Sequence, residues 1–146
     1  TVSAPPMAAA TPPPRLTGDW NDWPFTPGIW TYRRDGRYSV AQFGALGRNA
    51  TINFRCDAQN RRVTLSREAS AAGARMVIRT SYMTKTMAAT TSNANPAHLA
   101  ADIATTDPIL DAMAFSRGRV LVEMEGQQPV ILPTWAEIAR IVEDCR

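Results

Sequence analysis

The stretch from Asp107 to Arg146 constrains the fold most, because it predicts a helix, two strands and a second helix in turn. Asp107 is a suitable N-cap and Pro108 suits the first helical position, so a helix is predicted over about 107–116. Two short runs of apolar residues follow, over about 119–132, separated by a Gly- and Gln-containing turn. They predict a β-hairpin.

The second helix of this stretch is predicted over about 134–145. Thr134 followed by Glu137 has the spacing of a capping box. Glu143 and Asp144 lie at its carboxyl end, where the helix dipole disfavours acidic groups, so an arginine partner is expected for them. One side of the helix is apolar and is expected to face a sheet; it carries Trp135, Ile138, Ile141, Val142 and Cys145.

From Gly28 onward the sequence alternates between apolar and polar residues with the period of a half-buried antiparallel sheet. Asp35-Gly36, between two runs rich in aromatic and β-branched residues, predicts a hairpin. The fold class predicted is α+β and mainly β: an antiparallel β-sandwich or half-barrel of about seven short strands with two short helices. Further strands are expected near 50–56, 62–66, 75–82 and 84–91, with 99–104 as a strand or an extended approach.

The chain has 146 residues, which is the size of one domain. Residues 1–17 are rich in proline and alanine without periodicity and are interpreted as a tail or linker. Residues 18–146 are expected to form a single β-rich domain. Within the tail, Pro12, Pro13 and Pro14 are candidate partner-binding residues.

Two cysteines, Cys56 and Cys145, are far apart in the sequence. There is no C-x-x-C pattern and only one histidine, so a metal site is not expected and no cofactor is predicted. A structural disulfide in an oxidising compartment is the preferred interpretation, and two unrelated buried thiols are the alternative. The sequence begins at Thr1 without a signal segment, so either a leader was removed or the protein is cytosolic; a periplasmic or secreted protein is predicted.

Three aromatic residues, Trp20, Trp23 and Phe25, lie in a segment that also contains prolines and a glycine. The prolines and the glycine rule out a long regular element, so a loop or an edge is expected. Two interpretations stay open for it. The aromatic side chains cover the core as a lid, or they form an exposed surface that binds a partner.

Fifteen arginines and one lysine carry the positive charge, for a net charge of +3. Genome composition and bidentate recognition of anions both explain such a bias. The arginines are spread over many elements and mixed with acids, so nucleic acid is not an expected partner. No apolar run approaches the roughly 20 residues that span a bilayer. Arg117 and Arg119 flank Gly118 and are weak candidates for anion binding. The alternative is a helix end followed by two arginines that pair with Asp111 or Glu123.

The candidate catalytic residues are His98, Asp102, Asp111 and Glu123. No serine lies in a nucleophile-elbow motif, and no phosphate-binding loop is present. A hydrolase or a sugar-active enzyme therefore requires a pocket that gathers at least two of these four side chains. The sequence alone favours a protein that is not an enzyme.

The carboxyl-terminal motifs carry a resemblance. Leu110-Asp111-Ala112-Met113-Ala114-Phe115-Ser116-Arg117-Gly118-Arg119, Leu132-Pro133-Thr134-Trp135-Ala136-Glu137 and Glu143-Asp144-Cys145-Arg146 resemble an uncharacterised family of small exported proteins from sphingomonad-type α-proteobacteria. More distantly, the chain is similar to the invasion-associated locus B family of periplasmic β-rich proteins. The resemblance implies export and a β-rich fold, and it implies no catalytic residues.

The function predicted from these observations is that of a non-enzymatic exported envelope protein, an accessory or interaction subunit of a larger assembly. Its expected partners are proteins, with a membrane-associated complex as one setting, and the chain itself is not expected to span a membrane. Two alternatives are a small hydrolase or sugar-active enzyme, and a periplasmic carrier whose β-cavity holds a small apolar ligand.

Overall fold

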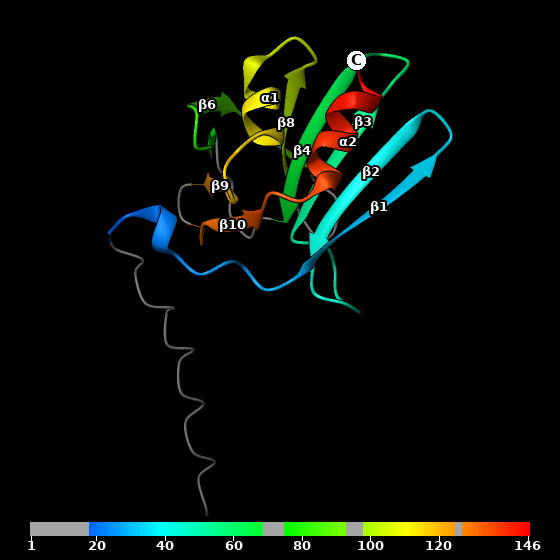
Figure 1. The fold of residues 1–146 in the computed structure, drawn as a ribbon. Helices are drawn as coiled ribbons and strands as arrows, with labels where there is room; N and C mark the ends of the chain where they lie inside the picture. The colour runs from blue at the N-terminus through cyan, green and yellow to red at the C-terminus, as the bar shows by residue number, and fades with distance from the viewer. Residues whose placement is uncertain (1–17, 69–74, 93–97, 125–126) are drawn as a thin grey trace, which may run out of the picture.

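The computed structural model describes residues 18–68, 75–92, 98–124 and 127–146, and within them the fold is mainly β (Figure 1). These residues form ten strands in two antiparallel sheets, where the sequence predicted about seven strands. The strands are β1 (Ile29–Asp35), β2 (Tyr38–Gly44), β3 (Ile52–Asp57), β4 (Arg62–Glu68), β5 (Arg75–Arg79), β6 (Thr84–Ala88), β7 (Thr90–Ser92), β8 (His98–Ala104), β9 (Arg119–Met124) and β10 (Val130–Pro133). The helices are α1 (Pro108–Ala114), α2 (Ala136–Asp144) and the short 3-10 helix η1 (Trp20–Asp22).

The larger sheet has six strands in the order β1-β2-β3-β4-β8-β7, and the smaller has the order β10-β9-β5-β6. The predicted hairpin at Asp35-Gly36 is confirmed, because Asp35 pairs with Tyr38 and Gly36 adopts a positive φ of 59°. Consecutive strands pair along β1 to β4, so the turns fix the register there. The register places every second residue of these four strands on one face.

The stretch predicted as one strand over 84–91 is divided between the two sheets. β6 ends at Ala88 on an edge of the smaller sheet, and β7 begins at Thr90 on an edge of the larger sheet. One residue, Ala89, therefore separates two strands that pair with different partners. The predicted edge position is confirmed for both pieces. The uncertain stretch near 99–104 is a full strand, β8, paired along its length with β4.

The two sheets and both helices share one apolar core. The alternation predicted for β3 is confirmed, because Ile52, Phe54 and Cys56 are fully buried and point into the core. Helix α2 covers the same face of the larger sheet, packed against β2 and β3 (Figure 1). Trp30 on β1 donates its indole N–H to the carbonyl oxygen of Pro133 on β10 at 2.9 Å, which connects the two sheets.

The disulfide between Cys56 and Cys145 is present, with a Cα–Cα distance of 5.7 Å. It joins the middle of the larger sheet, at β3, to the residue that follows α2. The prediction that α2 turns its apolar side to the sheet and carries Cys145 to the third strand is therefore confirmed for Ile138, Ile141, Val142 and Cys145. It is wrong for Trp135, which precedes the first residue of α2 and is exposed. The sulfur of Cys145 also lies 3.6 Å from the carbonyl oxygen of Arg62, at the start of β4.

The start of α1 matches its prediction, and the start of α2 does not. The carboxylate of Asp107 accepts a hydrogen bond from the Ile109 amide at 3.0 Å, and Pro108 is the first helical residue. Helix α2 begins at Ala136 with Trp135 as its N-cap and has no side-chain cap hydrogen bond. The predicted capping box is wrong, because the Thr134 hydroxyl lies one residue too early to be the N-cap and makes no hydrogen bond.

The acidic end of α2 also differs from its prediction. Asp144 accepts a hydrogen bond from the hydroxyl of Tyr32 at 2.5 Å rather than from an arginine. The Arg140 guanidinium lies 4.3 Å from the centre of the Tyr32 ring, so tyrosine connects the cation and the carboxylate. Arg146 pairs instead with Asp111 on α1 at 2.5 Å. Among the described residues, no helix has both the length and the apolar content needed to cross a membrane.

Candidate binding groove

The outer face of the larger sheet, the face turned away from the core, contains a groove of about 430 Å³. It crosses five strands and is lined by Arg33, Asp35, Tyr38, Val40, Gln42, Asn53, Arg55, Thr64, Ser66, His98 and Ala100. We call this set the outer groove. Its residues come from sequence positions far apart, and they meet because β1, β2, β3, β4 and β8 are neighbours in one sheet.

Cross-strand pairing explains the arrangement of the outer groove. Arg33 pairs with Val40, Val40 with Arg55, and Arg55 with Thr64, so these side chains form one row across the sheet. The small side chain of Val40 separates the two arginines. Because neighbouring strands lie about 4.8 Å apart, the backbones of Arg33 and Arg55 are about 10 Å apart. The row therefore presents two guanidinium groups on either side of a low floor.

The two groove arginines have no ion-pair partner among the described residues, whereas four other arginines do. Arg37, Arg62 and Arg79 each lie within 4 Å of a carboxylate, as does Arg146 after α2. Neither Arg33 nor Arg55 makes such an ion pair with any residue of the described ranges. The Arg55 guanidinium lies 4.7 Å from the centre of the Tyr38 ring, a contact that leaves its N–H donors available. The lining thus contains two arginines that form no ion pair with a carboxylate of the described residues, and Asp35 is its one acidic residue.

A second row supplies neutral polar groups. Gln42 pairs with Asn53, Asn53 pairs with Ser66, and Ser66 pairs with Ala100 on β8. The Gln42 side-chain amide donates to the Asn53 side-chain oxygen at 2.7 Å. This bond fixes both amide planes and leaves one carbonyl oxygen and further N–H groups for a ligand. The floor between the rows is low because Ala100, Ser66 and Val40 are small.

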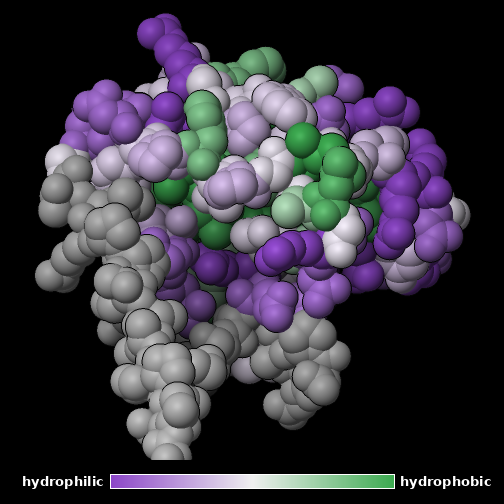
Figure 2. Space-filling model, turned by 90° about the horizontal axis from the view of Figure 1, so that it is seen from below, coloured by the Kyte–Doolittle hydropathy of each residue, from purple (hydrophilic) through white to green (hydrophobic). Residues whose placement is uncertain are grey.

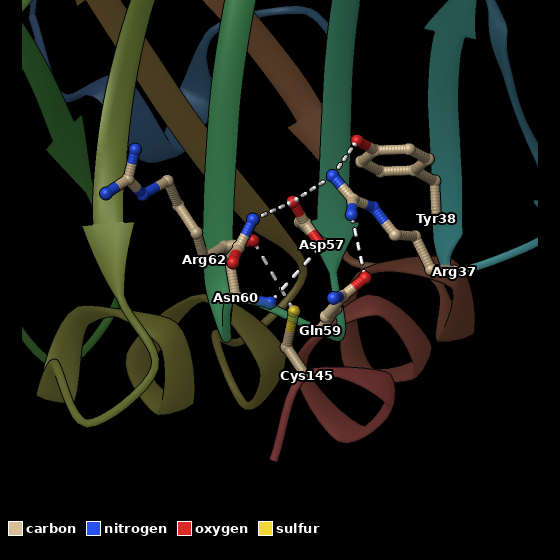
Figure 3. Close-up of polar contacts among 7 residues, drawn as sticks. All are labelled: Arg37, Tyr38, Asp57, Gln59, Asn60, Arg62 and Cys145. Carbon is tan, nitrogen blue, oxygen red and sulfur yellow. Dashed lines mark hydrogen bonds and ion pairs between the residues drawn. The ribbon is translucent and has the colours of Figure 1, made fainter.

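The end of the outer groove next to the β1–β2 turn is held by a polar network (Figure 3). Arg37 donates to Gln59 at 2.7 Å and to the Tyr38 hydroxyl at 2.5 Å, and its guanidinium lies 3.4 Å from the Asp57 carboxylate. Burial alone would raise the pKa of Asp57, but the hydrogen bonds from Asn60 and the charge of Arg37 lower it below its ordinary value. Tyr38 is thereby fixed as one wall of the groove.

Three further titratable side chains face the outer groove or its border. Asp35 lines it beside the turn, and His98 lines it on β8. Asp102, also on the outer face of β8, accepts a hydrogen bond from Thr64 at 2.8 Å and lies 3.7 Å from Arg62. Its charge is therefore compensated at the border, whereas Asp35 remains as the one acidic side chain in the lining.

The four candidate catalytic residues do not come together in this groove, which contains His98 alone of the four. His98 and Asp102 lie four residues apart on one strand, about 13 Å. Asp111 pairs with Arg146 on the helical side, and Glu123 pairs with Arg79 at 3.7 Å in the smaller sheet. The charge and hydrogen bond of Arg146 hold the pKa of Asp111 below its ordinary value. Asp102, Asp111 and Glu123 thus each lie within 4 Å of an arginine.

The aromatic segment lies beside β10 and is held there. Thr26 and Ile131 exchange two hydrogen bonds, at 3.0 and 2.9 Å, so the segment pairs with the free edge of β10. Trp20 and Trp23 are half-buried, and Phe25 is exposed. The segment covers a sheet edge and still presents Phe25 to solvent. The partner-binding role of Trp20, Trp23 and Phe25 stays a prediction.

Arg119 explains how this segment is fixed. Its guanidinium donates to the carbonyl oxygens of Trp20, at 3.4 Å, and Trp23, and lies 4.5 Å from the centre of the Phe25 ring. Arg119 is thus engaged within the protein, whereas the side chain of Arg117 is exposed. Anion binding by Arg117 and Arg119 stays a prediction. The expected pairing of Arg119 with Asp111 or Glu123 is wrong, because its partners are backbone carbonyl groups.

Two other surface regions are apolar. Tyr82, Met83, Pro108, Ala112 and Phe115 line most of a shallow groove of about 390 Å³ between the β5–β6 turn and α1. Figure 2 shows an apolar area framed by polar residues on the side of the molecule that is lowest in Figure 1.

The candidate partner-binding residues of the tail, Pro12, Pro13 and Pro14, lie outside the described residues.

No protein-family model matches the chain, and comparisons with curated proteins and with solved structures give no match. The outer groove was not predicted from the sequence, because its residues become neighbours only when β1, β2, β3, β4 and β8 pair in this order in one sheet. The available signal was the set of polar residues on the outward positions of the predicted strands, among them Arg55.

Proposed function

We propose that the protein is a non-enzymatic binding protein, an accessory or interaction subunit exported to the periplasm or outside the cell, and that the outer groove is its binding surface. The observation that supports this best is the pair Arg33 and Arg55, which face the groove without a carboxylate partner among the described residues. A volume of about 430 Å³ lies within the roughly 300–1,000 Å³ that ligand sites occupy.

A binding role is favoured over catalysis by the partners of the candidate acids. Asp102 and Glu123 each lie 3.7 Å from an arginine and outside the groove lining. The hydrogen bond and charge of Arg146 hold the pKa of Asp111 below its ordinary value, which opposes a role of this residue as a proton donor. His98 stands in the groove without any of these three carboxylates as an orienting group. The hydrolase alternative would need a second reactive group beside His98.

Export is supported by the bond between Cys56 and Cys145, since disulfides persist in oxidising compartments. It is also what the resemblance to small exported α-proteobacterial proteins implies. We further propose that the two sheets form a sandwich or half-barrel around the shared core. In that arrangement the outer groove lies on the outside of a covalently closed scaffold, where a partner or ligand has access.

The groove can be tested with a variant that fills it. Ala100→Trp places a large side chain on the floor, and Ala104→Trp on the same strand is the control, since Ala104 is exposed outside the groove lining. Both proteins and the wild type would be titrated with a tetrasaccharide of galacturonic acid, cellotetraose, hexaglutamate and hexalysine. Amide chemical shifts would be followed by NMR, and each probe would be recovered for mass spectrometry.

The proposal expects at least one probe to shift the amides of Gln42, Asn53 and Ser66 in the wild type and in Ala104→Trp, but not in Ala100→Trp. It also expects that probe to be recovered unchanged. If no probe shifts these amides, the binding role of the groove is wrong. If the probe is recovered cleaved or modified, the non-enzymatic part is wrong.

The export part has its own measurement. Cells that produce the protein from its native gene would be fractionated and treated with a maleimide, without reductant. Cys56 and Cys145 should resist labelling, and the protein should be found in the periplasmic or secreted fraction. A cytosolic protein with both thiols labelled would overturn export and leave the proposal for the groove standing.

A further inference from the structure

We infer that the outer groove binds an acidic oligosaccharide, a chain of sugar units that carry carboxylates. This inference rests on the proposed function and names the ligand class of the same site. Its first support is charge: Arg33 and Arg55 project from one cross-strand row, with Val40 between them. A guanidinium group matches the two oxygens of a carboxylate, and the roughly 10 Å between the arginine backbones suits a chain with repeated acids better than one small anion.

The neutral lining supports a sugar rather than a chain that is only acidic. A sugar hydroxyl both donates and accepts hydrogen bonds, so it needs neighbours of both kinds. The bonded pair of Gln42 and Asn53 presents a carbonyl oxygen and N–H groups in fixed planes, and the Ser66 hydroxyl is next in the same row. These groups lie within the groove that contains both arginines.

The Tyr38 ring argues against a neutral sugar. Neutral sugars commonly need an open aromatic face, against which their C–H groups pack. The guanidinium groups of Arg37 and Arg55 each lie 4.7 Å from the centre of this ring. With the ring engaged in this way, the floor of Val40 and Ala100 provides a modest apolar contact, and affinity must come from charge-assisted hydrogen bonds.

Asp35 sets the orientation of the ligand. It lines the same groove beside the β1–β2 turn, where a ligand carboxylate would be repelled. The carboxylates of the ligand are therefore placed on the Arg33 and Arg55 row and away from the turn, toward Gln42, Asn53 and His98. Removal of the Asp35 charge should strengthen binding, an effect opposite in sign to that of removing either arginine.

The test uses the intact protein and the linear tetrasaccharide of galacturonic acid, with affinity from calorimetry and position from amide chemical shifts. The methyl ester of the same tetrasaccharide keeps the rings and the other hydroxyls but removes the charge. Hexaglutamate keeps the charge but lacks the hydroxyls, and inorganic phosphate is a small anion. The acidic tetrasaccharide should bind at least about tenfold more tightly than each of the three.

Variants that remove charges inside and outside the groove locate the site. Arg33→Gln with Arg55→Gln should weaken binding of the acidic tetrasaccharide by at least about tenfold. Arg34→Gln removes a charge from the same strand on the opposite face and should change affinity by less than about twofold. Asp35→Asn should strengthen binding by about twofold or more. Gln42→Ala with Asn53→Ala should weaken the acidic tetrasaccharide and leave hexaglutamate binding unchanged.

Four results would overturn the inference. Hexaglutamate or phosphate bound as tightly as the acidic tetrasaccharide would make the groove a general anion site. A loss of binding free energy in Arg34→Gln that is half or more of the loss in the double arginine variant would make the effect one of net charge. Binding of cellotetraose or hexalysine in the groove, without the acidic tetrasaccharide, would refute the ligand class and keep the proposed function. If none of the probes reaches the groove, both fail.

Discussion

The two faces of the larger sheet are built from the same strands but present different kinds of side chain. The inner face is apolar, is covered by α2, and carries the disulfide to β3. The outer face carries two arginines without carboxylate partners in the described ranges, a fixed amide pair and a low floor. Phe54 and Arg55 are sequence neighbours, yet one is fully buried and the other exposed. The apolar core and the proposed binding surface are therefore separated by a single residue along a strand.

The largest expected effect lies on the inner face, at the disulfide. Cys56→Ala with Cys145→Ala should lower the free energy of unfolding by about 4–5 kcal/mol, because the bond closes a loop between residues separated by 89 positions. Urea unfolding of the variant and of the oxidised wild type measures the difference. Equal urea midpoints for the variant and the wild type would mean that the disulfide adds no stability beyond the packing of α2. In any variant that folds, the affinity of the outer groove for its ligand should be unchanged.

The next prediction compares adjacent residues on β3. Phe54→Ala removes a fully buried ring and should cost about 3–5 kcal/mol of stability. Arg55→Ala, one residue later, should stay within about 0.5 kcal/mol of the wild type, because its side chain is exposed. Thermal and urea unfolding give both values. Similar losses for the two variants would refute the separation of the faces.

A smaller effect is expected where the aromatic segment meets the smaller sheet. Arg119→Gln removes the donors to the carbonyl groups of Trp20 and Trp23 and should cost about 1.5 kcal/mol, as for a hydrogen bond to a charged group. Arg119→Lys keeps the charge but not the planar fork, so it should recover only part of this loss. Tryptophan fluorescence and limited proteolysis report on the segment. An unchanged cleavage rate near Phe25 would show that β10 pairing alone holds it.

The smallest effect concerns the α1 cap, away from both faces. Asp107→Ala should cost about 1 kcal/mol at neutral pH, because the Ile109 amide loses its acceptor. Burial alone would raise the pKa of Asp107, but Lys85 and the Ile109 amide lower it overall. A depressed folded pKa means that the carboxylate stabilises the fold fully above about pH 3.9, its unfolded value, and loses this effect as the pH falls through the folded pKa.

Asp107→Asn is the matched control, since it keeps a side-chain acceptor for the cap but removes the charge that pairs with Lys85. Its difference from the wild type should shrink as the solution is acidified, and urea unfolding at neutral and acidic pH measures it. The absence of any difference between Asp107→Asn and the wild type at neutral pH would assign the whole effect of Asp107 to the cap hydrogen bond.

Local features of the fold could be predicted from the sequence. The Asp35-Gly36 turn, the Asp107 cap and the inward positions of β3 all depend on residues within a few positions of one another. The cysteine pair was also predictable, because helix periodicity turns Cys145 to the same side as Ile141, and strand alternation places Cys56 inward.

The outer groove and the strand division at Ala89 were not predictable in this way. Arg33 and Arg55 become neighbours only when β1, β2 and β3 pair in one register. No local sequence pattern indicates that β4 pairs with β8. The capping-box prediction failed for a related reason. Thr134 has the right spacing from Glu137, but its backbone follows β10, and its amide donates to the carbonyl of Gly118 at 3.2 Å.

The position of the disulfide along the chain orders the events of maturation. Cys145 follows every strand and both helices, whereas Cys56 belongs to the third strand. The cross-link between them therefore requires that all of the intervening elements have been synthesised, and the docking of α2 on β3 brings the two sulfurs together. A chain that stops before Cys145 retains a single free thiol at Cys56, and a chain in which α2 is misplaced retains two, so the redox state of Cys56 reports whether this part of the fold has formed.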